Sequence, residues 1–251
     1  MLKQMKVAVN LNMFFPQLTL LERYQVAAAA GFKLVEVSLP YSESAETLRA
    51  TADKLGLKHT LINAPTGRLS CTFIFLIYLH FFRMIIYTVY ISDKYVIKIS
   101  HFRVHIMAGI PLSGEENTED LYVQNISYAA NRLNNDGIIC LIEPINNYTI
   151  PGYFLKSYEQ AFSKDCDREG KLSKFEDTIS MITKYKDDIG YIQIAQVPSR
   201  GAPNSPGEID YKYIFRILSE ANSNWIIGLE HLFTGDPEKL IEWISECGLS
   251  T

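Results

Sequence analysis

Two glutamates stand at the ends of apolar segments and could act as a pair of proton carriers. Glu143 ends the segment CLIE, and Glu230 ends the segment IIGLE. If both segments are strands of a parallel barrel, both carboxylates lie at the C-terminal strand ends, where such barrels carry their active sites. A carboxylate at that place can remove a proton from a substrate carbon or return one. The alternative is a glutamate that merely begins a solvated loop, and position alone does not decide between the two.

Three other polar residues are candidates for binding a ligand. Gln193 lies between Ile192 and Ile194 in an apolar strand, so its amide needs partners and is either a ligand or a core amide satisfied by the backbone. His105, in RVHIMAG, leaves the same two interpretations open. Arg200 follows a strand in the loop SRGAPNSPGE and is either an ordinary surface arginine or a bidentate partner for a substrate carboxylate.

The elements that must position these residues alternate between short apolar strands and amphipathic helices, the pattern of βα units around a parallel sheet. Expected strands cover 6–10, 34–39, 58–63, 104–108, 137–143, 191–197 and 225–230. Expected helices cover 18–30, 45–55, 119–133, 155–162, 172–185, 211–222 and 237–246. The length of 251 residues suits one (β/α)₈ TIM barrel, so we expect a single α/β domain over residues 1–251.

Two stretches break this alternation. Residues 68–102 are dominated by Ile, Tyr and Phe and would be apolar on every face of a helix. We therefore expect an anomalous apolar insert there, with the composition of a translated intron, in place of a packed barrel helix. Between Ala161 and Lys174 no strand candidate occurs, so the sixth strand of an eightfold pattern is missing. The barrel is expected to be incomplete.

Charge and targeting signals disfavour nucleic-acid binding and secretion, and the cytoplasm is the expected location. The net charge of −4 at pH 7 gives no basic footprint for nucleic acid. The four cysteines have neither disulfide-like nor metal-ligand spacing, and we expect free thiols. The N-terminus lacks the pattern of a secretory signal. The segment Cys71–Ile91 is long enough to span a membrane, but His80 and Arg83 near its middle disfavour that placement.

At the candidate residues the chain resembles the hydroxypyruvate isomerase family, a branch of the xylose isomerase-like TIM barrels. The similar blocks, in family order, are NLNMFF, AAAAGFKLVEVSLPY, LINAPTG, VHIMAGIP, LIEPIN, PGYFL, IGYIQIAQVPSRGAPNSPGEIDYKYIF and WIIGLE. They cover most of the chain, and LIEPIN and IQIAQVPSRG are the most distinctive of them.

The resemblance implies an enzyme of carbohydrate metabolism that performs an aldose–ketose type isomerisation. Hydroxypyruvate would interconvert with 2-hydroxy-3-oxopropanoate (tartronate semialdehyde) through an enediolate, with Glu143 and Glu230 sharing the acid and base roles. In related sugar isomerases and epimerases four strand ends hold one divalent metal, and the matching positions here are Glu143, Gln193 and Glu230. Their oxygen donors would suit Mg²⁺ or Mn²⁺, which would stabilise the enediolate charge. Arg200 and His105 would bind the substrate's carboxylate and oxygens.

The sequence also departs from the family pattern. Residues 68–102 replace a charged third helix and the Arg-Gly loop before it. The fourth metal ligand would be an aspartate on the missing sixth strand, and neither Asp165 nor Asp167 is assigned to that role. His231 stands where the family usually has Tyr, and Ala202 where it has Glu. These departures bear on activity more than on ancestry.

Other interpretations stay open at this point. The scaffold could carry a sugar epimerase, a four-carbon oxo-acid isomerase or a dehydratase, because a fold does not fix a substrate. The chain could also be a non-catalytic relative, or be anchored in a membrane through Cys71–Ile91. The sequence does not set the oligomeric state.

Overall fold

The computed structural model describes residues 4–65, 103–111, 117–162, 178–233 and 235–251. The apolar insert predicted at 68–102 lies outside these residues, as do the membrane-span candidate Cys71–Ile91 and most of the stretch where a sixth strand is missing. Asp165 and Asp167 lie outside them too. The described residues form two compact units. The single domain over 1–251 stays a prediction.

The first unit, residues 4–61 and 178–251 apart from 234, is built on a parallel sheet. Its strands are hydrogen-bonded in the order β3-β2-β1-β7-β6 and cover β1 (Lys6–Asn10), β2 (Leu34–Val37), most of β3 (Lys58–Asn63), β6 (Ile192–Ile194) and β7 (Ile226–Leu229). β1 pairs in parallel with β2 and β7, and β7 pairs in parallel with β6. Consecutive residues of β1, β2 and β7 are buried, so both faces of these strands are covered.

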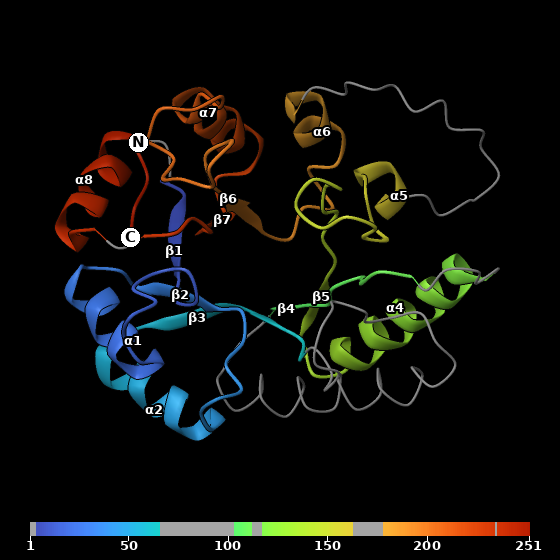
Figure 1. The fold of residues 1–251 in the computed structure, drawn as a ribbon, viewed down its shortest axis with the longest axis horizontal. Helices are drawn as coiled ribbons and strands as arrows, with labels where there is room; N and C mark the ends of the chain where they lie inside the picture. The colour runs from blue at the N-terminus through green and yellow to red at the C-terminus, as the bar shows by residue number, and fades with distance from the viewer. Residues whose placement is uncertain (1–3, 66–102, 112–116, 163–177, 234) are drawn as a thin grey trace. The chain divides into compact units, whose positions relative to one another are not determined.

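Helices accompany these strands in the chain order that the sequence predicts. They are α1 (Leu20–Ala29), α2 (Ala45–Leu55), α6 (Thr178–Lys184), α7 (Tyr211–Asn222) and α8 (Pro237–Glu246), and Figure 1 shows α1 and α2 side by side. Each long helix buries one stripe at helical spacing: Leu48 and Ala52 on α2 are examples, as are Phe215 and Leu218 on α7. These stripes hold the helices against the sheet.

Local signals fix the helix ends of this unit. The Thr19 hydroxyl accepts from the Glu22 backbone N–H at 3.4 Å, and the Glu22 carboxylate accepts from the Thr19 N–H at 2.8 Å, which is a capping box at the start of α1. Gly56 ends α2 at a φ of 69°, in the left-handed conformation that glycine adopts without a Cβ penalty.

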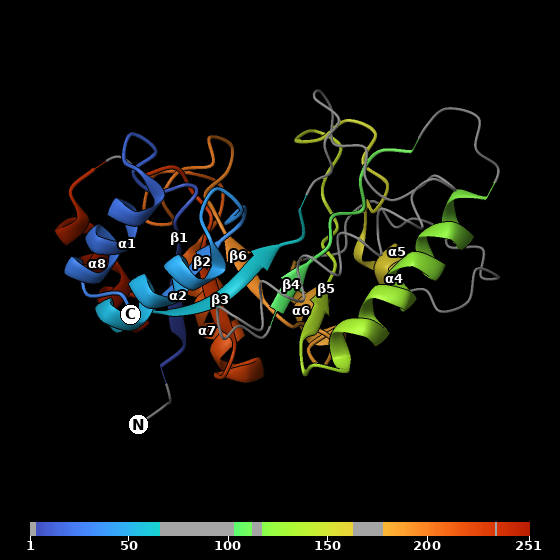
Figure 2. The same cartoon turned by 90° about the horizontal axis from the view of Figure 1, so that it is seen from below.

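The second unit contains the described residues between 62 and 162. β4 (Arg103–His105) pairs in parallel with the end of β3 and with β5 (Ile139–Leu141). α4 (Thr118–Asn134) runs beside β5 (Figure 2) and buries Tyr122, Ala129 and Leu133, and the short α5 (Tyr158–Phe162) follows. Within this part of the chain the elements appear where the sequence predicts them.

The predicted bounds of β1, α2, β3, α7 and α8 are confirmed, and the other strands are shorter than predicted. β5, for example, ends at Leu141, which pairs with His105, the last residue of β4. Across the described ranges, no helix combines the length and the apolar character that crossing a membrane requires.

Candidate active site

Four polar side chains of the first unit point to the same face of its sheet. Asn10 pairs with Glu36, and Gln193 pairs with Gly228. Gly228 also pairs with the β1 residue that lies two positions before Asn10, so β1 connects the two pairs. Glu230 lies two residues beyond Gly228. Since side chains two residues apart on a strand share a face, Asn10, Glu36, Gln193 and Glu230 all do so. The sequence predicts two of these four, Gln193 and Glu230.

Glu36 is a buried carboxyl group that is not among the predicted site residues. It is 1% exposed, and its Oε1 accepts hydrogen bonds from Asn10 Nδ2 at 2.7 Å and from Gln193 Nε2 at 3.0 Å. Burial raises the pKa of Glu36 to about 7, and the charge of Glu230 acts in the same direction, while hydrogen bonds from Gln193, Tyr191 and Asn10 oppose the shift. The signal in the sequence is a charged residue inside the apolar run LVEV.

The absence of a side chain at Gly228 makes room for this carboxyl group. A Cβ at position 228 would lie 2.5 Å from Glu36 Oε2 and 2.9 Å from Cε1 of Tyr191. The Tyr191 hydroxyl is hydrogen-bonded to Thr60 Oγ1 at 2.9 Å, which holds the ring in place. Glycine at 228 is therefore required by the close approach of Glu36 and Tyr191.

Glu230 follows the last residue of β7 and is held by Arg200. Arg200 Nη2 lies 2.9 Å from Glu230 Oε2, and Arg200 Nε donates to the Glu230 main-chain oxygen at 3.0 Å. The Glu230 backbone N–H donates to the carbonyl of Ile194 at 3.0 Å, so both its main chain and its side chain are fixed. The two side chains are 26% and 41% exposed, which leaves them accessible to a small molecule. The substrate-binding role of Arg200 stays a prediction.

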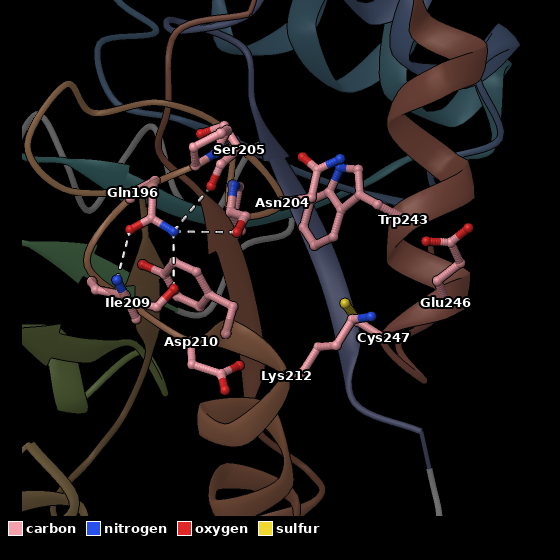
Figure 3. A pocket seen from close by; sticks show the side chains of 13 residues that line it. Gln196, Asn204, Ser205, Ile209, Asp210, Lys212, Trp243, Glu246 and Cys247 are labelled. Carbon is pink, nitrogen blue, oxygen red and sulfur yellow. Dashed lines mark hydrogen bonds between the residues drawn. The ribbon is translucent and has the colours of Figure 1, made fainter.

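The loop that carries Arg200 is organised by Gln196, which the sequence does not mark as special. Gln196 and Gly201 exchange two backbone hydrogen bonds, at 2.8 and 3.2 Å. The buried Gln196 side chain accepts from the Val197 N–H at 3.0 Å. It also accepts from the Ile209 N–H and donates to the Ile209 carbonyl, both at 3.0 Å (Figure 3). These bonds fix the loop conformation and thereby the backbone position from which the Arg200 side chain extends.

A pocket of about 460 Å³ is bounded by the same loop, the start of α7 and the end of α8. Figure 3 shows Gln196, Lys212, Trp243 and Cys247 around it. None of the predicted site residues lines this pocket. The predicted site residues therefore lie outside this pocket.

In the second unit, His105 and Glu143 are neighbours on one face. His105 pairs with Leu141, the residue two before Glu143, and its Nε2 lies 3.7 Å from Glu143 Oε2, which is longer than a hydrogen bond. Burial lowers the pKa of His105 to about 4, so the imidazole is neutral at pH 7. The Glu143 side chain is 40% exposed. Burial raises the pKa of Tyr153 and of Tyr158, and the Glu143 charge raises both further.

The donors predicted for a metal are oxygen atoms, as a hard divalent ion requires. Gln193 and Glu230 supply such atoms in the first unit, and Glu143 supplies them in the second. Within the ranges that the structure describes, no group of three or more His, Cys, Asp or Glu side chains is placed to hold a metal ion. The donor chemistry would suit Mg²⁺ or Mn²⁺, and the sequence predicts three of the ligands but not the fourth.

Comparisons with known proteins identify the family of this chain. A family model described as xylose isomerase-like TIM barrel matches residues 24–247. A Caenorhabditis elegans protein, named in provisional form as a hydroxypyruvate isomerase, is 45% identical over 98% of each chain. The 2-oxo-tetronate isomerase of Cupriavidus necator is 34% identical over 90% of this chain and 92% of its own. A crystal structure described as an AP endonuclease of family 2 from Brucella melitensis superposes with a TM-score of 0.80, at 26% identity, over 96% of this chain and 98% of that one.

The match to the family model and the identities to full-length isomerases confirm the fold and the ancestry that the sequence predicts. The chain therefore belongs to the xylose isomerase-like TIM barrel family and, within it, to the hydroxypyruvate isomerase family of isomerases.

Proposed function

We propose that this protein is a hydroxypyruvate isomerase that interconverts hydroxypyruvate and 2-hydroxy-3-oxopropanoate in the cytoplasm. The observation that carries the proposal is the Glu230 carboxylate at the C-terminal end of β7, held by Arg200 and accessible to a small molecule. The name of the Caenorhabditis elegans relative supports the substrate. The free thiols of Cys140 and Cys247 support a reducing compartment.

The reaction moves a carbonyl group between adjacent carbons. A base removes a proton from the hydroxymethyl carbon of hydroxypyruvate, and the electron pair forms the C=C bond of an enediolate. An acid returns a proton to the central carbon, and one further proton passes from the terminal oxygen to the central oxygen. Substrate and product are isomers, so no electrons leave the molecule, and two proton-transferring groups account for the carbon chemistry.

Glu143 and Glu230 are the proposed proton-transferring groups. Both side chains are partly exposed, at 40% and 26%, so a substrate carbon can reach them. The ion pair with Arg200 presents Glu230 as a carboxylate, the form that accepts a proton. The neutral imidazole of His105 beside Glu143 can donate or accept a hydrogen bond with a substrate oxygen.

Arg200 is proposed to bind the substrate carboxylate as well as Glu230. Its contacts with Glu230 are made by Nε and Nη2 and do not involve Nη1. A guanidinium group offers several N–H donors in one plane, which suits a second carboxylate. The substrate carboxylate would then bind beside the carboxylate of Glu230.

A Mg²⁺ or Mn²⁺ ion is proposed as cofactor, with Glu143, Gln193 and Glu230 as the residues that would hold it. Such an ion stabilises the negative charge that develops on the enediolate oxygens. The protein's own part is to present carboxylate and amide oxygens, and Gln193 does so from a strand, with its N–H₂ group bound to Glu36.

A second candidate substrate is 2-oxo-tetronate, because the Cupriavidus necator relative carries that name. The proton transfers are the same, and the substrate has one more carbon. Incubating the purified protein with each oxo acid in D₂O, with and without added Mn²⁺, tests both. NMR should show product with deuterium on the carbon that receives the proton. If neither acid exchanges or isomerises, the chain is a non-catalytic relative and the proposal is wrong.

A further inference from the structure

The orientation of the Gln193 amide can be traced to a main-chain group. The backbone N–H of Asn12 donates to Asn10 Oδ1 at 2.9 Å. Because a backbone N–H can only donate, the oxygen of the Asn10 amide must face Asn12 and its nitrogen must face the other way. That nitrogen, Nδ2, donates to Glu36 Oε1 at 2.7 Å and to Ser38 Oγ at 3.1 Å.

The next link passes through the carboxyl group of Glu36. Its Oε1 accepts from Asn10, and Gln193 Nε2 approaches the same oxygen at 3.0 Å. If Glu36 is ionised, Oε1 can only accept. Gln193 must then turn its N–H₂ group toward Glu36, and its own carbonyl oxygen is directed away. A proton on Glu36 Oε2 leaves this direction unchanged, whereas a proton on Oε1 would donate to the Gln193 carbonyl and turn the amide over. The direction is therefore fixed while Oε1 of Glu36 is an acceptor only.

Burial keeps water from replacing these partners. Asn10 is 0% exposed and Glu36 is 1% exposed, so a mismatched amide would leave a polar atom without a hydrogen bond. Gly228 leaves the space that the Glu36 carboxyl group occupies, since a Cβ there would lie 2.5 Å from Glu36 Oε2. With Oε1 of Glu36 as an acceptor, the chain of donors and acceptors has one consistent arrangement.

We propose that Asn10 and Glu36 form an orienting relay, which fixes the Gln193 amide so that its carbonyl oxygen is presented to a bound divalent cation. Glu36 is in this view a positioning residue that acts through Gln193 and touches neither substrate nor cation. The inference rests on the proposed function for the presence of the cation, but not for the direction of the hydrogen bonds.

A charge-neutral exchange of two residues inverts the relay. In the double variant Asn10→Asp/Glu36→Gln, the new carboxylate at position 10 still accepts from Asn12 N–H but now presents an acceptor to position 36. The amide nitrogen of the new glutamine would donate both to that carboxylate and to Gln193. Every hydrogen bond is kept, and Gln193 must turn over, so that its N–H₂ group points to the cation. Glu36→Gln alone keeps the native direction, because the new amide oxygen can replace Oε1.

The experiment measures urea unfolding without metal and Mn²⁺ binding by titration calorimetry for the wild type and these variants, with Asn10→Asp as a fourth protein. Asn10→Asp should lower the unfolding midpoint, since two acceptors face each other, and the double variant should recover most of that loss. The double variant should bind Mn²⁺ about tenfold more weakly than Glu36→Gln, the scale on which partners of metal ligands act. The matched control is Asn222→Asp/Glu220→Gln on α7, where Glu220 is exposed and an aspartate can still accept from Asn224 N–H. This control should change neither the unfolding midpoint nor the affinity for Mn²⁺.

The comparison separates orientation from charge. A purely electrostatic effect predicts that the double variant binds Mn²⁺ more tightly than Glu36→Gln, because it regains a carboxylate. Equal or tighter binding by the double variant therefore overturns the proposal, and so does an unfolding midpoint that does not recover from that of Asn10→Asp. If the wild type does not bind Mn²⁺, the cation of the proposed function is wrong, and so is the claim that Gln193 presents its oxygen to a cation. Recovery of the urea unfolding midpoint in the double variant would still decide the direction of the hydrogen bonds in the relay.

Discussion

Arg200 contacts Glu230 at two separate groups, with Nη2 2.9 Å from the carboxylate and Nε donating to the main-chain oxygen at 3.0 Å. Two contacts from one planar guanidinium fix both the position and the rotation of the glutamate. Arg200 itself adopts a φ of 54°, a left-handed conformation that is uncommon for a residue with a side chain. The loop held by Gln196 keeps Arg200 in that conformation.

Arg200→Lys should lower kcat/KM for the isomerisation by about tenfold, because an ammonium group keeps the charge but cannot make both contacts. A loss mainly in kcat would indicate that Arg200 orients Glu230, and a loss mainly in KM that it binds the substrate carboxylate. Steady-state kinetics with hydroxypyruvate give the two values. The control is Arg49→Lys, in an exposed arginine–aspartate pair on α2, which should have no effect. Unchanged kcat and KM in Arg200→Lys would contradict both roles.

Glu143→Gln and Glu230→Gln should each lower turnover at least about 100-fold, since each removes a group that carries a proton. The amide keeps the shape of the side chain, so both variants should unfold at nearly the wild-type temperature. Glu220→Gln makes the same chemical change at an exposed site and should keep full activity. If either catalytic variant retains near-normal turnover, that residue is not an acid or base in the reaction.

Gly228→Ala should reduce the free energy of unfolding by about 1–3 kcal/mol, because the new methyl group would lie 2.5 Å from Glu36 Oε2. Chemical denaturation measures the change. The cost should be clearly smaller when the same substitution is made in a Glu36→Ala background, where the opposing carboxyl group is gone. Equal costs in the two backgrounds would show that Glu36 does not occupy the space above Gly228.

His231 should make the protein less stable in acid. It is 0% exposed, and neither ring nitrogen has a hydrogen-bond partner among the described residues. Burial lowers its pKa to about 4 from a usual 6.5. Between these values the unfolded chain binds a proton that the folded chain does not, so stability falls as the pH drops from 6.5 to 4, by up to about 3 kcal/mol.

His231→Phe should remove this contribution while keeping the ring contact with Phe14, whose centroid is 5.0 Å away. Urea unfolding at about pH 7 and about pH 4.5, on either side of most of this titration, measures the difference for variant and wild type. His105, with a similarly lowered pKa, should leave the variant with part of the acid sensitivity. A variant that loses as much stability in acid as the wild type would mean that His231 is hydrated or paired in solution.

The sequence by itself determines the elements and the ancestry of this protein. The bounds of α2 follow from local causes, namely an N-capping Ser44 and a C-terminal Gly56 around a helix with one apolar stripe. The strands in or just after which Glu143, Gln193 and Glu230 lie follow from apolar runs and family motifs. Such signals span only a few residues, so they can be recognised in the sequence without knowing what packs against them.

The tertiary structure alone decides which of these residues touch. Gln193 is hydrogen-bonded to Glu36, 157 residues away in the sequence, and no local pattern predicts that contact. Glu36 resembles any strand glutamate until the register brings Asn10 and Gly228 beside it. Arg200 and Glu230 are likewise joined by a loop whose shape depends on the buried side chain of Gln196. Hydrogen bonds between strands distant in sequence depend on register and burial, and these exist only once the sheet has formed.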